Sequence, residues 1–415
     1  MEKRTGQDVP LETQPQPAPL SNEAVTGYTA ALWKYHPVPT EELEPFPECR
    51  VSCRTHPGGT VIAANVRGKK HKHEGNNCDD WFEESSVGEL VFAAVSDGAG
   101  SRKFSRIGAR ESCRAAVGYL VSTFETLWVQ QPELSEHIAL EFGDERCMDA
   151  CRVLAGVVRQ AVLKAREAVE TAFLTRSADP AYTAALGRPL EWKDFAGTLL
   201  VAAVFPAGAA GKLTITCQIG DGIIALIDSK APFAASVKLM GAPDSGVFSG
   251  ETEFLISARM GTQEALQSRT KLSRSHSDIL LMMTDGVADD YFPHETEIRR
   301  LYCDLAVNGI LERDTPEDEA LTGSQKLPEP LGYPWVNDQS VQIPLHYTRR
   351  IMESTGLRLE NLWGNRGIMA LARRDLAGQL ALEQPEARLQ RWLDNYVERG
   401  SFDDRTLVIV EMKEA

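Results

Sequence analysis

Features that mark several other protein classes are scarce or missing in this sequence of 415 residues. Its eight cysteines are too few for a disulfide scaffold, and the close pairs are Cys49/Cys53 and Cys147/Cys151. The second pair falls in a helical pattern that puts both thiols on one face. A metal site there is the alternative to buried free thiols, which we favour because no further ligand pair follows. This cysteine usage predicts a reduced, cytoplasmic protein.

Membrane-directing segments and excess positive charge are also missing. The N-terminal residues contain no apolar signal core. The longest uncharged apolar run, residues 195–211, is interrupted by Pro206 and is too short to span a bilayer. Lys and Arg total 44 against 59 Asp and Glu, which gives a net charge of −15. Since proteins that coat nucleic acid or anionic membranes need positive surface, neither partner is expected.

The remaining composition is that of a chain with a substantial core, with 43% hydrophobic residues. Residues 1–47 are rich in proline and predict an extended tail, whereas 48–415 predict one domain with a mixed insertion at about 302–365. Strands are predicted at 60–66, 89–95, 195–205, 213–219, 222–227, 278–283 and 406–411, and helices at 103–130, 146–174 and 385–399. So many strands between paired helices predict an α+β fold with sheet packed on sheet and helices outside.

Aspartates recur beside glycine where a buried strand ends, at Asp97, Asp221 and Asp285. Two Asp pairs, 79–80 and 403–404, join this set. A single Asp-Gly is typical of an ordinary turn. Several carboxylates that converge without a basic residue repel one another, and Mg²⁺, Mn²⁺ or Ca²⁺ relieves that repulsion. The neighbouring glycines allow close approach of the backbone. The set therefore predicts a carboxylate metal centre.

An ordered series of motifs contains these aspartates. The series is RGKKHKHEGNNCDDW at 67–81, SDGAGS at 96–101, FAGTLLVAAV at 195–204, IGDG at 219–222, MTDGVAD at 283–289 and DDRT at 403–406. In this order the motifs resemble the bacterial branch of the metal-dependent type-2C Ser/Thr protein phosphatase family, over about residues 60–412. The resemblance implies two antiparallel β-sheets packed as a sandwich, flanked by helical pairs, with two Mn²⁺ or Mg²⁺ ions at one edge.

The resemblance also implies a role for each motif position. The implied metal ligands are Asp80, Asp97, Gly98, Asp285 and Asp403, with Asp221 and Asp289 at a weaker third site. Asp97 would bridge both metals, the Gly98 carbonyl would bind one of them, and Asp80 and Asp97 are therefore also predicted to be catalytic. Asp79 is an alternative to Asp80, because alignment on Gly75 and Cys78 favours Asp80 whereas counting from Asn77 favours Asp79. Asp404 stands where the family often has Asn.

The implied reaction is hydrolysis of phosphoserine or phosphothreonine by a metal-activated water. The sequence has neither the C-x5-R loop of cysteine phosphatases nor a G-x-S-x-G elbow. Ala99 occupies the place of the family's proton-donating His, so His71 is the predicted acid, with His73 and metal-bound water as alternatives. The family's phosphate-gripping Arg has no clear counterpart either, and Arg67, His73 and Arg102 are the candidates.

These observations predict a phosphatase that acts on phosphorylated proteins, the substrates of a bacterial Ser/Thr kinase. The missing His and Arg keep an alternative open, a catalytically silent module that binds a protein partner or phosphopeptide. A metal-dependent nuclease also fits paired carboxylates, but the net charge of −15 disfavours nucleic acid. The insertion at 302–365 is either a flap that selects substrates or a plain surface excursion.

Overall fold

The computed structural model describes residues 33–241, 252–311, 336–337, 340–341, 347–363, 365, 367–370, 384–395 and 401–413. The chain divides into two units, Met1–Trp33 and Lys34–Ala415, and only Trp33 of the first is described. The architecture is therefore that of Lys34–Ala415.

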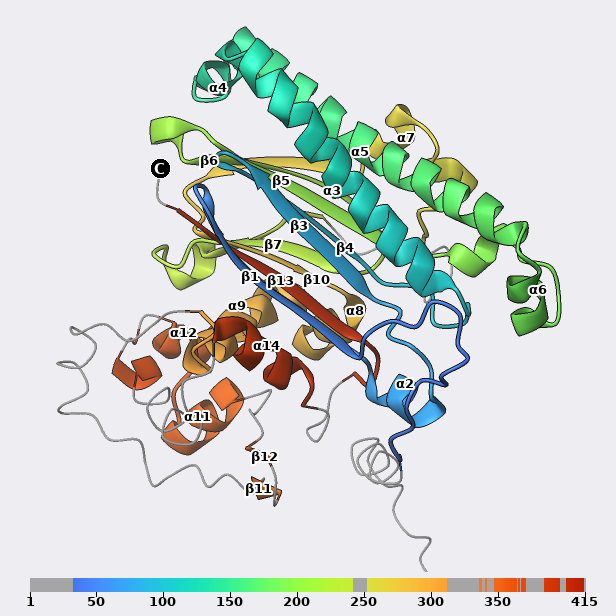
Figure 1. Ribbon diagram of the computed structural model, residues 1–415. Coiled ribbons are helices and arrows are strands. Elements are labelled where there is room, and N and C mark those ends of the chain that lie inside the picture. The colour runs from blue at the N-terminus through green and yellow to red at the C-terminus, as the bar shows by residue number, and fades with distance from the viewer. Residues whose placement is uncertain are drawn as a thin grey trace, which may run out of the picture. The chain divides into compact units, whose positions relative to one another are not determined.

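Two antiparallel sheets occupy its centre (Figure 1). The six-stranded sheet has the order β1 (Cys49–His56), β2 (Gly59–Val66), β13 (Arg405–Met412), β10 (Ile279–Met283), β7 (Ile223–Ile227) and β8 (Val237–Leu239). The five-stranded sheet has the order β3 (Trp81–Val87), β4 (Leu90–Ser96), β5 (Leu199–Pro206), β6 (Lys212–Ile219) and β9 (Thr270–Ser275). A separate short pair joins β11 (Val336–Asn337) and β12 (Ser340–Val341). The last long strand, β13, lies inside the first sheet and not at its edge.

Side chains that point alternately to the two faces of each sheet form three hydrophobic layers. In β4, Val91 and Val95 face the six-stranded sheet, whereas Leu90 and Phe92 face outward toward helices. Because successive side chains point to opposite faces, a strand buried on both sides must be apolar throughout. This explains the nearly continuous apolar runs of the central strands and confirms the predicted sandwich.

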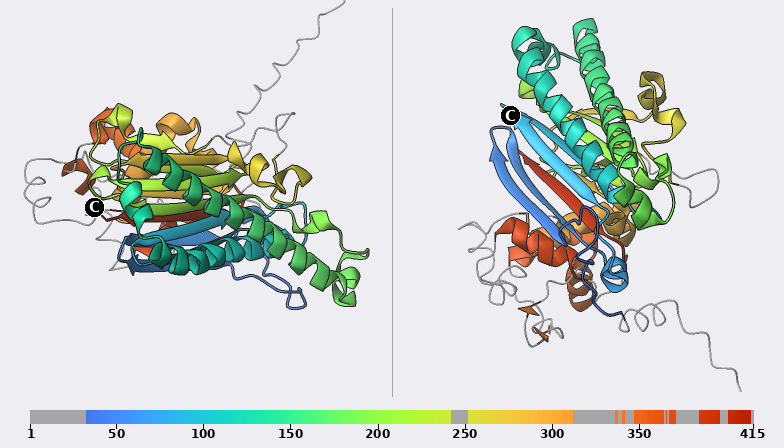
Figure 2. Two further views of the ribbon diagram at one scale, coloured as in Figure 1. Left: turned by 90° about the horizontal axis from the view of Figure 1, so that it is seen from above. Right: turned by 45° about the vertical axis from the view of Figure 1, so that its right-hand side comes forward.

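Helices cover both outer faces (Figures 1 and 2). The long helices α3 (Ser105–Gln130) and α5 (Glu145–Ser177) lie side by side on the five-stranded sheet. On the six-stranded sheet lie α9 (His294–Val307) and α14 (Pro385–Leu393), with α11 (Tyr347–Thr355) packed on α9. Shorter helices are α2 (Lys69–Glu74), α4 (Glu133–His137), α6 (Pro180–Leu186), α7 (Gln263–Gln267), α8 (Asp285–Ala288) and α12 (Leu359–Leu362). No helix among the described residues is long and apolar enough to cross a membrane.

The predicted boundaries differ from the structure at two places. Residues 34–47, which we call the N-terminal arm, lay within the predicted tail but are bonded to the domain, since Arg67 donates to the His36 carbonyl and Asn77 accepts from the Phe46 N–H. Residues 302–307 lay within the predicted insertion but belong to α9, where Leu305 is fully buried. Much of the predicted insertion, including residues 312–335 and 342–346, lies outside the described residues, as do residues 1–32.

Candidate metal centre

The registers of the two sheets bring the predicted ligands to one edge of the sandwich. Since β3 pairs with β4, Asp80, which precedes β3, lies beside Asp97, which follows β4. Since β13 pairs with both β2 and β10, residues 403–404 lie between the segments that follow those two strands. Segments far apart in the sequence therefore meet where the strands end.

Asp97, Asp221 and Asp285 form a group that we call the open cluster. Asp97 follows β4, Asp221 closely follows β6, and Asp285 begins α8 just after β10. One oxygen of each carboxylate lies within 4.8 Å of the other two. At this spacing, three hard oxygen donors are able to share one divalent cation.

The glycine of each Asp-Gly pair allows another backbone segment to approach closely. A Cβ atom at Gly286 would lie 1.9 Å from the Asp404 carbonyl oxygen, and one at Gly222 would lie 2.5 Å from that of Met283. At Gly98 the nearest atom would be the Asp79 carbonyl oxygen, at 2.7 Å. Any larger residue would push apart the segments that carry the carboxylates, so the close approach predicted from these glycines is confirmed.

Burial and the negative charges of neighbouring aspartates raise the pKa values of two carboxyl groups of the open cluster. Burial and the negative charges of Asp285 and Asp80 raise the pKa of Asp97 well above its usual range. Burial and the charges of Asp221 and Asp403 raise the pKa of Asp285 to about 7. No basic side chain is among the main influences on either group. A bound cation would supply the positive charge that the described residues do not.

Asp80 presents one buried oxygen that has no donor. It is 1% exposed, and its Oδ2 accepts hydrogen bonds from Thr284 Oγ1 at 2.9 Å and Thr406 Oγ1 at 2.6 Å. Its Oδ1 has no hydrogen-bond partner within the described part of the chain. Asp221 is arranged in the same way, since Thr252 donates to Oδ2 while the buried Oδ1 is left without a partner. Buried unsatisfied acceptors are costly, and a hard cation satisfies them, so this donor set fits Mg²⁺ or Mn²⁺.

Asp403 and Asp289 lie at the rim of the same region. Asp403 is exposed and accepts from the Asp404 N–H at 2.9 Å, and its charge acts on Asp97 and Asp285. Asp289 follows α8, and burial together with the charge of Asp221 raises its pKa. The structure thus brings the predicted carboxylates together at one edge.

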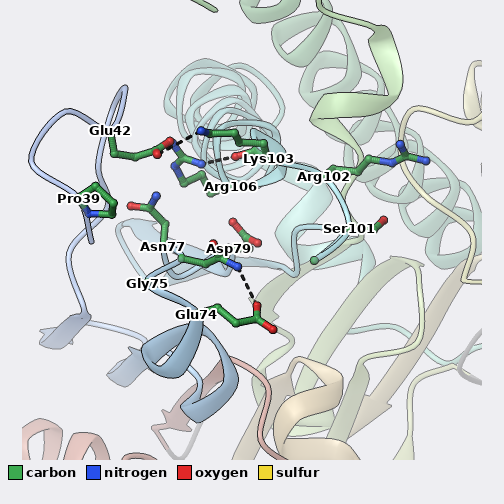
Figure 3. A pocket seen from close by; sticks show the side chains of 12 residues that line it. Pro39, Glu42, Glu74, Gly75, Asn77, Asp79, Ser101, Arg102, Lys103 and Arg106 are labelled. Carbon is green, nitrogen blue, oxygen red and sulfur yellow. Dashed lines mark hydrogen bonds and ion pairs between the residues drawn. The ribbon is translucent and has the colours of Figure 1, made fainter. Parts of the chain in front are cut away.

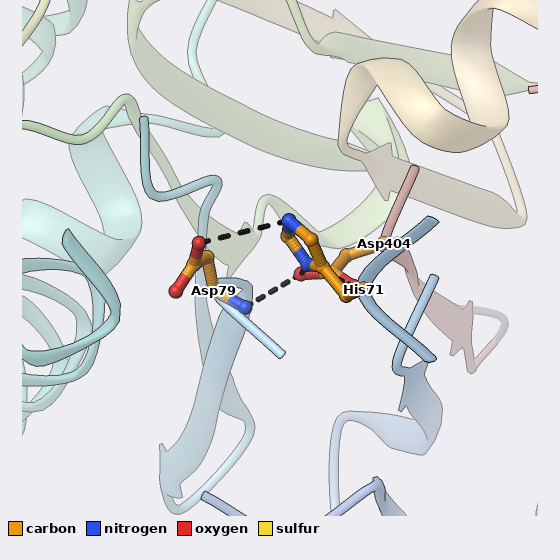
Figure 4. Close-up of side chains that lie close together, drawn as sticks. All are labelled: His71, Asp79 and Asp404. Carbon is orange, nitrogen blue, oxygen red and sulfur yellow. Dashed lines mark hydrogen bonds and ion pairs between the residues drawn. The ribbon is translucent and has the colours of Figure 1, made fainter. Parts of the chain in front are cut away.

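His71, Asp79 and Asp404 form a second group, which we call the closed cluster (Figure 4). The Asp404 carboxylate accepts from the backbone N–H groups of Gly68 and Asp79, and His71 Nδ1 lies 3.0 Å from both of its oxygens. His71 Nε2 lies 4.0 Å from Asp79 Oδ2. Burial alone would lower the pKa of His71, but the charge and hydrogen bond of Asp404 raise it to about 10. His71 therefore compensates the charge of Asp404, whereas burial and the charge of Asp404 raise the pKa of Asp79 to about 8.

The three predicted phosphate-binding residues have different surroundings. Arg67 is fully buried and donates to Glu48 and to the carbonyls of His36 and His71, each at 2.8 Å. These bonds give Arg67 a structural role that disfavours phosphate binding. His73 lies on α2 with Nδ1 within 3.1 Å of the Lys34 backbone N.

Arg102 lines a cavity of about 400 Å³ beside Asp79 (Figure 3). Its side chain extends away from Asp79, whereas Lys103 and Arg106 turn toward Glu42 of the N-terminal arm, at 3.5 Å and 3.0 Å. The walls of the cavity are the N-terminal arm, the residues after α2 and the loop after Asp97. The sequence did not reveal this cavity because one wall belongs to the predicted tail.

Comparisons with known proteins show a family match and several similar solved structures. The family model described as protein phosphatase 2C matches residues 67–322. The fold is similar to that of a bacterial serine phosphatase, at 14% identity and a TM-score of 0.39, covering 86% of this chain and 98% of that one. RsbX in complex with magnesium has 9% identity, a TM-score of 0.33 and coverage of 88% and 100%. Stp1, a serine/threonine phosphatase from Staphylococcus aureus, has 13% identity, a TM-score of 0.33 and coverage of 92% and 98%. No curated protein matches the sequence.

Proposed function

We propose that this chain, which belongs to the protein phosphatase 2C family, is a metal-dependent phosphatase that hydrolyses phosphoserine and phosphothreonine in proteins. The observation that carries the proposal is the open cluster, in which carboxylates from three strand ends lie within 4.8 Å of one another. Such a group has no evident role in stabilising the fold, because its members repel one another. It suits the binding of divalent cations and, through them, of phosphate.

The proposed ligands are those at the edge of the sandwich. Two Mn²⁺ or Mg²⁺ ions would be held by Asp80, Asp97, the Gly98 carbonyl, Asp285 and Asp403, and a weaker third by Asp221 and Asp289. Asp80 is preferred to Asp79 because its buried Oδ1 has no hydrogen bond and Asp285 is among the charges that act on it. Asp79 instead faces His71 and the cavity.

Metal ions at this site would lower the pKa of a bound water and neutralise phosphate oxygens. His71 is the proposed general acid. Asp404 holds Nδ1, which leaves the proton on Nε2 as the one available to a departing Ser or Thr oxygen. A Cβ atom at Gly100 would lie 3.8 Å from His71 Nε2, so this nitrogen lies under the loop that follows Asp97.

Arg102 is the candidate that we retain for binding phosphate, since it stands on that loop and lines the cavity beside Asp79. Its charge also acts on Asp194. The cavity beside Asp79 has room for a substrate side chain next to the phosphorylated residue. The proposed substrates are phosphorylated proteins, including those of a bacterial Ser/Thr kinase, in the cytoplasm.

A catalytically silent module is the second candidate. Ala99 cannot donate a proton, and the bonds of Arg67 occupy most of its guanidinium. A chain without a proton donor or a phosphate clamp would still bind metal and a phosphopeptide.

One assay separates these functions. Hydrolysis of p-nitrophenyl phosphate and of a phosphothreonine peptide is measured with Mn²⁺, with EDTA and with Asp97→Asn. Asp228→Asn is the matched control, because Asp228 lies at the opposite end of β7 from Asp221 and caps a turn there. The proposal predicts hydrolysis with Mn²⁺, loss of about 1,000-fold or more in EDTA and in Asp97→Asn, and little change in the control.

Activity that persists in EDTA or in Asp97→Asn would contradict the metal-dependent mechanism. Mn²⁺ binding without hydrolysis of either substrate would instead favour the silent module.

A further inference from the structure

Asp290 and Arg405 adjoin the proposed ligands but are not among them. Asp290 follows Asp289, and Arg405 follows the aspartate pair at 403–404. Both side chains are buried, with 6% of Asp290 and 1% of Arg405 exposed. Arg405 Nη2 donates to Asp290 Oδ2 at 3.0 Å. A buried ion pair thus joins the segment after α8 to the first residue of β13.

The Asp290 carboxylate holds both ends of the turn that carries Asp403. Its Oδ1 accepts from the Ser401 N–H at 2.7 Å, while its Oδ2 accepts from Arg405. Arg405 Nη2 also donates to the Ser401 carbonyl at 2.8 Å. These bonds close a ring around residues 401–405, so the exposed Asp403 projects from a turn that is fixed at both ends.

Arg405 connects the same turn to two helices. Its Nε donates to the Gly286 carbonyl in α8 at 3.3 Å. Its Nη1 donates to the carbonyls of Leu393 and Asn395, at 3.1 Å and 2.9 Å, at the end of α14. Gly286 directly follows Asp285. The guanidinium therefore fixes Asp285 relative to Asp403 through directional bonds, which an apolar side chain of equal volume would not supply.

The charge of Arg405 acts on its partner Asp290. The main charge influences on Asp97 and Asp285 are other aspartates, while Arg405 acts on Asp290. The bonds of the pair thus contribute to the geometry of the proposed metal centre.

We propose that the Asp290–Arg405 pair is a positioning device that sets the separation of Asp285 and Asp403 and so tunes the metal affinity of the centre. The inference rests on the proposed function in one respect, the identity of the bound cations. Outer partners that orient metal ligands commonly change affinity by 10–100-fold when they are replaced.

Mn²⁺ affinity of the full chain, measured by isothermal titration calorimetry, tests the inference. Asp290→Asn, Arg405→Lys and Arg405→Met are each expected to weaken Mn²⁺ binding by about 10–100-fold. The double variant Asp290→Asn/Arg405→Met is expected to bind no more weakly than the worse single variant, because both changes break one interaction. At saturating Mn²⁺, the KM for a phosphopeptide should stay within about twofold of the wild-type value.

Arg299→Met is the matched control. The Arg299 guanidinium is also mostly buried and donates to the carbonyls of Phe233 and Ala234, but it touches no proposed ligand segment. It should lower the unfolding temperature without changing Mn²⁺ affinity.

Unchanged Mn²⁺ affinity in the folded Asp290→Asn and Arg405→Lys variants would overturn the inference and leave the proposed function intact. Wild-type Mn²⁺ binding without hydrolysis would refute the proposed function, while the affinities of the variants would still decide the inference. A wild-type chain that binds no Mn²⁺ would overturn both.

Discussion

The open and closed clusters are neighbouring groups of acidic side chains with opposite kinds of partner. In the closed cluster, the Asp404 carboxylate accepts from two backbone N–H groups and pairs with His71. In the open cluster, the main influences on Asp97 after burial are four other aspartates. Local donors therefore decide which carboxylates are satisfied by the protein and which require a cation.

The same contrast is found between the two adjacent aspartates at 289–290 and at 403–404. Asp404 and Asp290 are held by backbone N–H groups and by a histidine or an arginine. Their neighbours Asp403 and Asp289 lie at the rim of the open cluster. At each of these two places, one aspartate forms hydrogen bonds that hold the local backbone, and the other is a proposed metal ligand.

The largest expected effect separates Asp80 from Asp79. Asp80→Asn should lower kcat/KM at a fixed Mn²⁺ concentration by more than about 100-fold, since loss of a ligand should exceed loss of an outer partner. Asp79→Asn should cost less than about tenfold, because Asp79 contacts His71 and the cavity. A larger loss of kcat/KM in Asp79→Asn than in Asp80→Asn would show that Asp79 is the metal ligand and would contradict its assignment to the closed cluster.

A smaller effect is expected where the closed cluster serves catalysis. His71→Gln and Asp404→Asn should lower kcat for a phosphothreonine peptide by about 100-fold, as is usual for loss of a general acid. The effect on p-nitrophenyl phosphate should be only a few-fold, because p-nitrophenolate departs without a proton. Equal losses on both substrates would assign the cluster a purely structural role.

Carboxylates that repel one another and carboxylates that accept from basic side chains should show opposite pH dependence of stability in the metal-free protein. The pKa of Asp285 is raised from 3.8 to about 7, so its folded form holds a proton that the unfolded chain releases. In EDTA, stability should fall as pH rises between about 4 and 7, and Asp285→Asn should flatten that slope. Urea unfolding at several pH values between about 4 and 7 measures this change in the free energy of unfolding. A wild-type slope that Asp285→Asn leaves unchanged would contradict the prediction.

Glu44 of the N-terminal arm should have the smallest effect on stability, with a pH dependence opposite to that of Asp285. Burial alone would raise its pKa, but hydrogen bonds from Arg176, Tyr182 and Arg110 lower it to about 2. Its stabilisation is therefore present above about pH 4.5 and is lost as pH falls toward 2. Because Glu44 is partly exposed, Glu44→Gln should cost only about 1 kcal/mol in unfolding free energy at pH 7. A cost that stays constant down to pH 2 would contradict the assignment.

The central strands were predictable because burial on both faces makes them apolar throughout, as in β4 and β10. The four edge strands, β1 and β8 of one sheet and β3 and β9 of the other, were missed. Most of their side chains are half-buried or exposed and some are charged, so no long apolar run marks these strands. The N-terminal arm was assigned to a tail because its anchors, such as Arg176, lie more than a hundred residues away from Glu44.

Residues of the candidate site were predictable where a short sequence pattern around the residue indicates its position at a strand end. Asp-Gly after a buried strand marked Asp97 and Asp285 from the sequence alone. The pairing of His71 with Asp404 spans 333 residues, and no local pattern encodes it. The orientation of Asp80 by Thr284 and Thr406 likewise depends on the register between β10 and β13. Contacts set by strand register become visible only in three dimensions.

The central claim is that the open cluster binds divalent cations whereas the closed cluster does not. Anomalous difference density from crystals soaked in Mn²⁺ tests it directly. The account predicts peaks beside Asp97 and Asp285 and none between His71 and Asp404. Density at the closed cluster alone, or no density at the open cluster, would contradict it.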